Sequence, residues 1–186
     1  MRKFYTIESD FMAQDYKIRL GRLPDGINKR AFLLDEWQYV DDSRVFMQYE
    51  KVGTGLPDVY TYNVPLVSAK FKEVLDDAGI TNCFFKPICL FENKEQTADY
   101  FLMLVEPLDC VIWDKSQYIE DCGLRKITGG FDIDSKKVGN FKIFKIFKIK
   151  DILNRFWVID QDMKERIEEA GINAARILEI GEYWGL

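Results

Sequence analysis

The sequence predicts an α+β fold, built as a single domain with a mostly antiparallel sheet and two main helices. Two segments, residues 69–78 and 161–170, carry apolar residues at helical spacing between a polar cap and a glycine. Runs rich in β-branched and aromatic residues surround them. The 186 residues, 47% of them hydrophobic, are enough for one sizeable core and exclude intrinsic disorder.

Residues 1–59 are expected to be a mainly β or irregular part, followed by an α+β core over residues 60–186 within one compact unit. Within residues 1–59, short apolar runs are separated by turn-forming Pro, Gly and Asp residues. The expected strands span residues 3–7, 31–34 and 44–49, with breaks at residues 23–26 and 53–55.

The segment 69–78 is expected to be an α-helix. Ser68 precedes it as a capping residue, and Gly79 ends it because glycine adopts left-handed backbone easily. Four apolar residues between them share one face at spacings of three and four. They are Phe71, Val74, Leu75 and Ala78.

Three β-rich runs follow this helix. Residues 83–91 and 99–106 predict a hairpin joined by the polar stretch 92–98. Pro87 has no backbone N–H, so we expect it at a sheet edge or a bulge. Residues 109–113 predict a further strand.

Residues 158–172 repeat the pattern of residues 66–80 at a separation of 92 residues. Each copy has a polar cap before its helix and an apolar strand after it. Any capped amphipathic helix ending in Ala-Gly-Ile would give some likeness, so chance is one interpretation. The other is a strand–helix–strand unit used twice, with both helices packed against a largely antiparallel sheet.

Residues 141–150 consist of three Phe-Lys-Ile triplets and a final lysine. A period of three fits neither the two-residue repeat of a strand nor the 3.6-residue repeat of a helix. The β-branched and aromatic content favours a strand whose lysines protect an aggregation-prone segment. A helix is the alternative.

The chain has no histidine, which excludes Ser-His-Asp triads, Cys-His dyads and His-ligated metal sites. Its cysteines, Cys83, Cys89, Cys110 and Cys122, form no CxxC pair. We therefore expect no metal and no cofactor. Cys83, Cys89 and Cys110 lie in apolar runs, so we expect them to be buried thiols in a reducing compartment. Without a secretion signal or a membrane-spanning apolar run, the chain is expected to be cytoplasmic.

Two carboxylate patterns resemble catalytic motifs. Asp132 and Asp134 have the spacing of an aspartyl-phosphate nucleophile, but glycines instead of an apolar strand precede them, which favours a turn. Asp58 with residues 92–94 mimics the magnesium-binding set of many nucleases, a match that chance produces readily in so charged a chain. We predict no catalytic residue. A divergent metal-dependent hydrolase or nuclease is the alternative.

Charge is unevenly distributed along a chain whose net charge is −5. Residues 124–150 carry +6, between −6 over residues 65–123 and −4 over residues 151–186. An acidic chain with one basic segment suits a protein partner better than nucleic acid or a membrane surface. The basic segment indicates candidate partner contacts at Lys142, Lys145 and Lys148.

Other candidate partner contacts are acidic or aromatic. The acidic candidates are Asp35, Glu36, Asp41 and Asp42. Tyr183 and Trp184 are expected to dock onto the body of the fold. Alternatively they form a binding hot spot, since Trp and Tyr dominate interface energetics.

The order of these elements resembles the family eleven immunity proteins of bacterial polymorphic toxin systems. The likeness spans roughly residues 60–180 and leaves residues 1–59 unmatched. It rests on Leu66-Val67-Ser68, Ala78-Gly79-Ile80, Phe85-Lys86-Pro87-Ile88 and residues 71–75, 99–104, 143–146, 158–160 and 167–171.

The resemblance implies an α+β protein without catalysis that is made beside a secreted or contact-delivered toxin and neutralises it by tight binding. It names neither the toxin nor any catalytic residue, and it leaves the oligomeric state open. An inhibitor encoded by a phage or another mobile element would have the same composition, so it stays an alternative.

Overall fold

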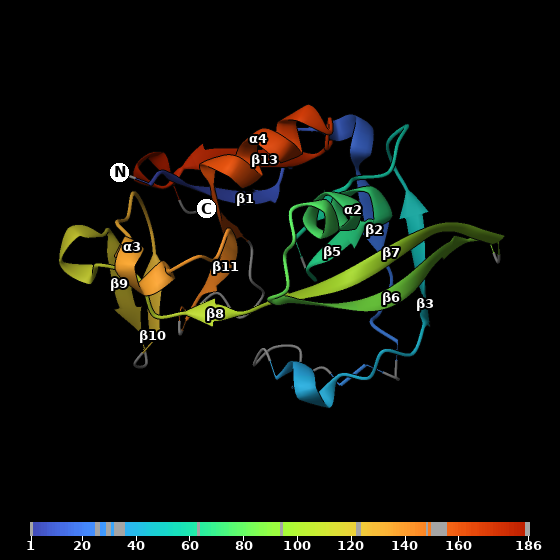
Figure 1. Ribbon diagram of the computed structural model, residues 1–186. Coiled ribbons are helices and arrows are strands. Elements are labelled where there is room, and N and C mark those ends of the chain that lie inside the picture. The colour runs from blue at the N-terminus through green and yellow to red at the C-terminus, as the bar shows by residue number, and fades with distance from the viewer. Residues whose placement is uncertain are drawn as a thin grey trace.

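The computed structural model describes residues 2–24, 27–28, 31, 36–62, 64–93, 95–121, 124–147, 149 and 156–184. Its strands form a six-stranded sheet, a five-stranded sheet and a two-stranded hairpin (Figure 1). Most neighbouring strands are antiparallel, and helices pack on the sheets, which confirms the predicted α+β class. None of the described helices is long and apolar enough to cross a membrane.

The six-stranded sheet has the order β2-β3-β6-β7-β5-β4. Only β3 and β6 run parallel. The strands are β2 (Ile18–Leu20), β3 (Val45–Lys51), β4 (Val59–Tyr60), β5 (Leu66–Ser68), β6 (Cys83–Glu92) and β7 (Glu95–Val105).

The five-stranded sheet has the order β13-β1-β12-β11-β8, so the first strand of the chain lies between two of the last ones. Only β8 and β11 run parallel. Its strands are β1 (Phe4–Ser9), β8 (Pro107–Leu108), β11 (Ile143–Ile146), β12 (Trp157–Asp160) and β13 (Ala175–Glu179). The hairpin consists of β9 (Tyr118–Asp121) and β10 (Leu124–Ile127), near the short helix α3 (Ser135–Val138).

Both predicted main helices are present, as α2 (Ala69–Asp77) and α4 (Gln161–Glu169). Ser68 caps α2 by accepting a hydrogen bond from the N–H of Phe71 at 3.1 Å. Asp160 caps α4 in the same way. Each helix ends at a glycine with positive φ, 70° at Gly79 and 61° at Gly171, because only glycine takes this conformation without strain.

The strand–helix–strand unit is used twice. In the first copy α2 connects β5 to β6, and β7 lies between these two strands in the sheet. In the second copy α4 connects β12 to β13, and β1 takes the middle place. The equivalence extends to the outer neighbours, since β4 pairs with β5 as β11 pairs with β12.

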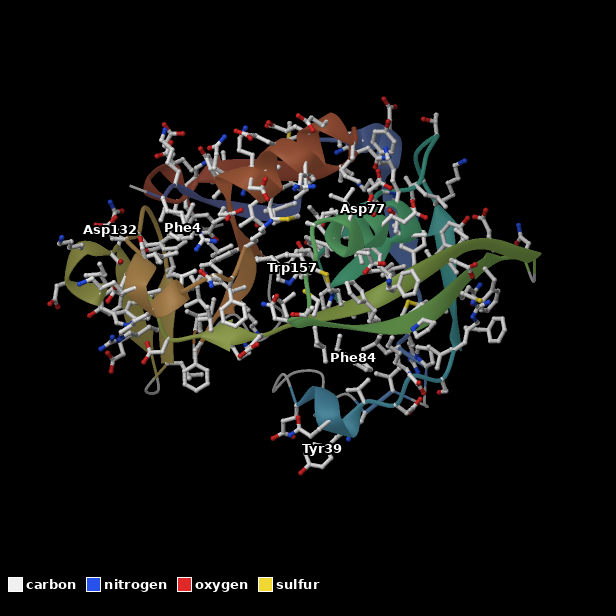
Figure 2. All side chains as sticks on the ribbon, viewed as in Figure 1. Phe4, Tyr39, Asp77, Phe84, Asp132 and Trp157 are labelled. Carbon is white, nitrogen blue, oxygen red and sulfur yellow. The ribbon has the colours of Figure 1, made fainter. Side chains whose placement is uncertain are left out.

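The two copies share one hydrophobic core. The ring of Phe71 from α2 stacks on that of Trp157 from β12, with 6.3 Å between their centroids. Trp157 lies at the centre of the molecule, between the two units (Figure 2). Leu75 and Ile167, at equivalent positions of the helices, are also buried in this core. A second cluster packs Ile27, Ala31 and Val40 against the six-stranded sheet, and a third joins β10, α3 and β11.

Two further strands match their expected positions, since β1 and β3 cover most of residues 3–7 and 44–49. The strand expected at residues 31–34 cannot be compared, because residues 32–34 lie outside the described residues. The hairpin of β6 and β7 is confirmed, and its pairing extends to Glu92 and Glu95, within the polar stretch 92–98. The strand expected at residues 109–113 is wrong. Val111 makes only an isolated bridge to Ile133 before the chain turns into the 3-10 helix η3 (Trp113–Lys115).

Pro87 and part of the Phe-Lys-Ile run both lie in interior strands of the sheets. Pro87 lies in an interior strand, but the pairing of β6 with β3 begins at Ile88, so Pro87 stands just beyond the end of that ladder. The Phe-Lys-Ile run forms a strand only over Ile143–Ile146, in the interior of the five-stranded sheet. Lys148 and Lys150 lie outside the described residues.

Candidate functional site

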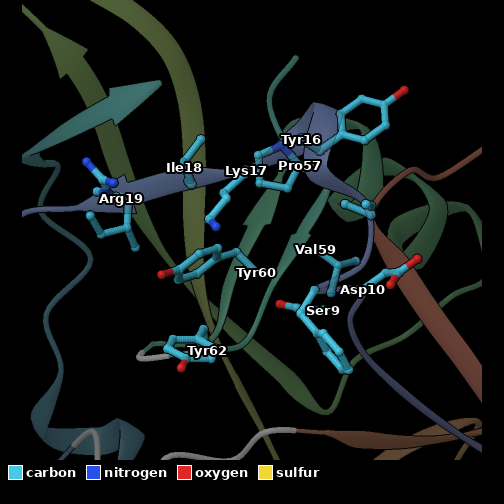
Figure 3. A pocket seen from close by; sticks show the side chains of 14 residues that line it. Ser9, Asp10, Tyr16, Lys17, Ile18, Arg19, Pro57, Val59, Tyr60 and Tyr62 are labelled. Atoms are coloured by element: carbon cyan, nitrogen blue, oxygen red, sulfur yellow. The ribbon is translucent and has the colours of Figure 1, made fainter. Parts of the chain in front are cut away.

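A pocket of about 520 Å³ opens between β2 and β4, the two edge strands of the six-stranded sheet (Figure 3). Residues 9–16, which lead from β1 into the 3-10 helix η1 (Gln14–Tyr16), form a third wall. Aromatic side chains contribute much of the lining, and Lys17 and Arg19 bring positive charge to the β2 side. The pocket is thus built from segments that lie far apart in the sequence.

A tight turn after β3 holds the β2 wall in place. The N–H groups of Thr54 and Gly55 both donate to the carbonyl of Asp15, each at 2.8 Å. Gly53 donates to the carbonyl of Lys17 at 2.9 Å. A Cβ atom on Gly53 would lie 2.2 Å from the carbonyl oxygen of Asp15, so this close approach requires glycine. The sequence Gly53-Thr54-Gly55 therefore has a structural role.

The side chains around the pocket offer both apolar surface and hydrogen-bond donors. Tyr60 is half-buried in the β4 wall, and burial raises the pKa of its phenol, which therefore stays protonated. Tyr62 is 62% exposed at the rim. The ammonium of Lys17 is exposed and contacts no hydrogen-bond or ion-pair partner among the described residues. Arg19 pairs with Glu50 across β2 and β3, where both side chains are exposed.

An aromatic cluster continues the pocket surface toward the C-terminus. The guanidinium of Arg176 lies 4.3 Å from the ring centroid of Trp184 and 5.4 Å from that of Phe11, which also lines the pocket. Glu8 accepts hydrogen bonds from Arg176 and fixes its orientation. Trp184 and Phe11 stay 48% and 42% exposed. We refer to Phe11, Arg176 and Trp184 as the aromatic cluster.

The two C-terminal aromatics have different environments. Tyr183 is buried and packs edge-on against Phe131, with 5.8 Å between ring centroids, and also contacts Phe156. It is docked on the fold, as one of the two interpretations expects. Trp184 is half exposed and available to a partner, which keeps the hot-spot interpretation open for this residue.

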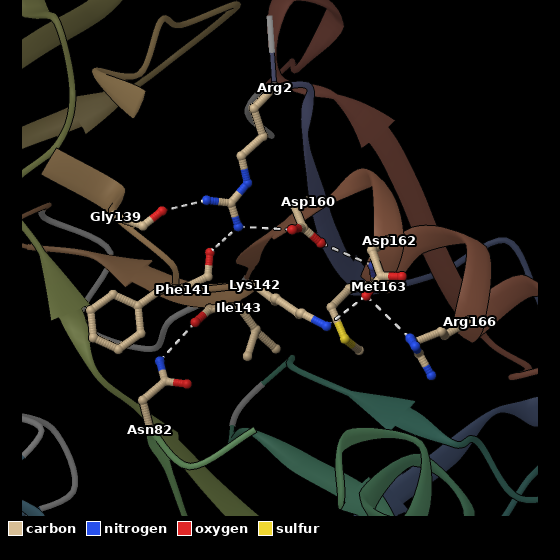
Figure 4. Close-up of polar contacts among 10 residues, drawn as sticks. All are labelled: Arg2, Asn82, Gly139, Phe141, Lys142, Ile143, Asp160, Asp162, Met163 and Arg166. Atoms are coloured by element: carbon tan, nitrogen blue, oxygen red, sulfur yellow. Dashed lines mark hydrogen bonds and ion pairs between the residues drawn. The ribbon is translucent and has the colours of Figure 1, made fainter. Parts of the chain in front are cut away.

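The candidate lysines do not share one environment. Lys142 donates to Asp162 at 2.8 Å, and Arg166 binds the same carboxylate, so their hydrogen bonds hold the pKa of Asp162 below its usual value (Figure 4). Lys145 is buried within β11, which leaves little of its side chain for a partner. Lys148 lies outside the described residues. A role of Lys142 in partner contact stays a prediction.

The acidic candidates also differ. Asp35 lies outside the described residues, Glu36 is half-buried and Asp42 is exposed. Asp41 is bound internally: its carboxylate accepts from the ammonium of Lys86 at 2.9 Å and from the hydroxyl of Ser43. These hydrogen bonds, that of Ser43 first, hold the pKa of Asp41 well below its usual range. Partner contact by Glu36, Asp41 or Asp42 stays a prediction.

The carboxylates that resemble catalytic motifs have structural partners. Asp58 is buried and accepts hydrogen bonds from the Ser68 hydroxyl at 2.6 Å and the Asn173 N–H at 2.9 Å. Glu92 accepts from the backbone of Lys51. Asp134 caps α3, next to an exposed Asp132. Within the part of the chain that the structure describes, no group of three or more Cys, Asp or Glu residues could hold a metal ion.

Sequence reasoning missed most of the pocket. Tyr60 and Tyr62 carried a usable signal, because two aromatic residues two apart would share one face of an extended chain, although β4 itself ends at Tyr60. Phe11 and Arg176 carried none, since they meet only when β1 pairs with β13.

Comparison with models of known families matches residues 8–182 to an immunity protein family, Imm11. The match begins within the N-terminal part, where the resemblance seen in the sequence did not reach. It therefore includes the walls of the pocket and Phe11 and Arg176 of the aromatic cluster. A search of curated proteins found no match.

Proposed function

Because the chain belongs to the Imm11 immunity protein family, we propose that it binds a cognate bacterial toxin and neutralises it without catalysing a reaction. The match over residues 8–182 is the observation that carries this proposal. We propose further that the toxin belongs to a polymorphic toxin system and that the complex forms in the bacterial cytoplasm.

The surface between the pocket and the aromatic cluster supports a binding role. Trp, Tyr and Arg are the residues most often found at the energetic centres of protein interfaces. Here Arg176 lies against the rings of Trp184 and Phe11, and Phe11 lines the pocket together with Tyr62. Met12, the residue after Phe11, is 72% exposed. Large apolar side chains gathered at one place on a surface are typical of an interaction site.

Co-expression tests the proposal. A toxin gene identified beside the gene for this chain would be expressed in a heterologous bacterium with and without this chain. We expect growth arrest by the toxin alone, rescue by this chain, and a stable complex when the two purified proteins are mixed. An unrelated immunity protein is the control for specificity. Absence of both rescue and complex would refute the proposal.

Activity assays test the non-catalytic part separately. Broad screens for phosphatase, nuclease and esterase activity should be negative with the purified chain. A metal-dependent turnover that is lost in Asp132→Asn or Glu92→Gln would instead support a divergent hydrolase.

A further inference from the structure

The pocket lies between the two edges of the six-stranded sheet. β2 and β4 are the terminal strands in the order β2-β3-β6-β7-β5-β4, and both contribute to the pocket walls. The edge of β4 is partly covered, because Ser9 and Thr61 exchange hydrogen bonds there. The edge of β2 faces the pocket.

The backbone of β2 presents polar groups to this pocket. The carbonyl of Lys17 accepts from the N–H of Val52, and the N–H of Gly21 donates to the carbonyl of Gln48. The backbone N–H and C=O groups of residues 17, 19 and 21 therefore point toward β3. Polar groups alternate in direction along an antiparallel strand, so those of Ile18 and Leu20 point away from β3. Among the described residues nothing hydrogen-bonds to them, because β3 is the only neighbour of β2 in the sheet.

Two cations, Lys17 and Arg19, and one carboxylate, Asp10, line the pocket beside this edge, so its net charge is positive and favours an acidic occupant. A second copy of the chain pairing through its own β2 would bring Lys17 and Arg19 close to the same cations, which is repulsive. Lys17 contacts no carboxylate among the described residues. A segment with an acidic side chain would provide that counter-charge, and the Tyr60, Val59 and Phe11 side chains would contact an apolar neighbour two residues along.

We propose that an extended, acidic segment of the toxin adds to β2 as a seventh strand, with an apolar side chain in the pocket and a carboxylate at Lys17. This inference rests on the proposed function. Main-chain hydrogen bonds to Ile18 and Leu20 supply affinity, whereas the pocket and Lys17 select the sequence, as in other complexes formed by strand addition.

Two substitutions with matched controls test this proposal in a titration with the purified toxin. Leu20→Pro removes an outward-facing N–H but no hydrogen bond to β3, so the strand tolerates it. Leu20→Ala shortens the same side chain and keeps the N–H. We expect the Kd for the toxin to be about tenfold higher for Leu20→Pro than for Leu20→Ala.

The same titration tests the role of the positive charge of Lys17. Lys17→Glu should raise the Kd by about tenfold or more, because it repels the acidic segment. Lys136→Glu makes the same charge change at an exposed lysine of α3, on the other side of the molecule (Figure 1), and should leave the Kd unchanged. Thermal unfolding of all four variants identifies any that has lost its fold.

Amide hydrogen exchange supplies a second readout that needs no substitution. In the free protein the Ile18 and Leu20 amides should exchange rapidly, and toxin binding should slow both by about tenfold or more. If the wild-type chain binds the toxin but neither the Leu20→Pro effect nor this protection appears, strand addition is refuted and the proposed function stands. If the wild-type chain neither binds nor neutralises the toxin, both proposals fail.

Discussion

Lys86 shows how a single buried cation organises a surface loop. Its side chain is fully buried in β6, and its ammonium donates to the carboxylate and the carbonyl of Asp41 and to the carbonyl of Ser43. Burying an ammonium is unfavourable unless it is paired and hydrogen-bonded, so residues 41–43 are held in place by that requirement. The charge of Asp41 is thus used within the protein.

We predict that Asp41→Asn lowers the melting temperature at pH 7, because it leaves the Lys86 ammonium without its counter-charge. The Asp41 pKa is lowered in the folded state, so its stabilising contribution is complete above the ordinary value of about 4 and is lost as the pH falls further. The difference in melting temperature between the wild type and Asp41→Asn should therefore become smaller below about pH 4. Melting curves at several pH values measure it, and a difference independent of pH would contradict this account.

Cysteine reactivity provides another test at single residues. Cys83, Cys89 and Cys110 are free thiols, and burial raises the pKa of Cys83 and of Cys110 to about 12. At pH 8 the thiolate fraction of Cys83 and of Cys110 is then about one in ten thousand, whereas a thiol with the usual pKa near 8.5 is about one quarter ionised. We expect iodoacetamide to label them slowly in the native protein and quickly in denaturant. Rapid native labelling at Cys83 or Cys110, detected by mass spectrometry of peptides, would show that these thiols are accessible and ionised.

At the scale of elements, each strand–helix–strand unit has an ion pair between its helix and the residue before a neighbouring strand, and the two pairs have opposite order. Asp58 precedes β4 and lies 3.9 Å from Lys70 of α2. At the equivalent positions Lys142 precedes β11 and lies 2.8 Å from Asp162 of α4. Only the second of these pairs has both side chains well exposed, where such a pair adds about 0–1 kcal/mol, because the Asp58 carboxylate is buried. Their reversed order nevertheless distinguishes one unit from the other.

We predict that the cores beneath the two helices are equally sensitive. Leu75→Ala and Ile167→Ala each remove a fully buried side chain and should reduce the free energy of unfolding by about 2–5 kcal/mol. Glu73→Ala and Glu169→Ala, on the exposed faces of the same helices, should change it by less than about 0.5 kcal/mol. Urea denaturation measures all four. A large loss for one buried position only would show that the units do not share a core.

These elements also show what the sequence could reveal. The helices were predictable because Ser68, Gly79 and their counterparts act through local hydrogen bonds and backbone conformation. The pocket was not, since its walls come from residues 9–20, 57–62 and 174, which only the sheet order brings together. The burial of Lys145 was equally hidden, because it depends on β8 and β12 flanking β11.

At the scale of the whole molecule, β1 joins the two ends of the chain. It pairs with β12 over Phe4 to Ile7 and with β13 over Tyr5 to Ser9. We predict that deletion of residues 1–9 abolishes cooperative unfolding, because both neighbours lose their shared partner and Ile7 leaves the core. Lys3→Ala, at an exposed position, should retain a wild-type transition. A cooperative thermal transition in the deletion variant, followed by circular dichroism, would contradict this prediction.

The central position of β1 also determines when the protein becomes able to act during its own synthesis. Its partner strands leave the ribosome roughly 150 residues later, which at about 5–20 residues per second is roughly 10–30 s. The contact between Phe11 and Arg176 likewise forms only after residue 176 has been synthesised. A cell that depends on this chain against an arriving toxin would therefore need a standing stock of finished protein, because newly started chains respond too late.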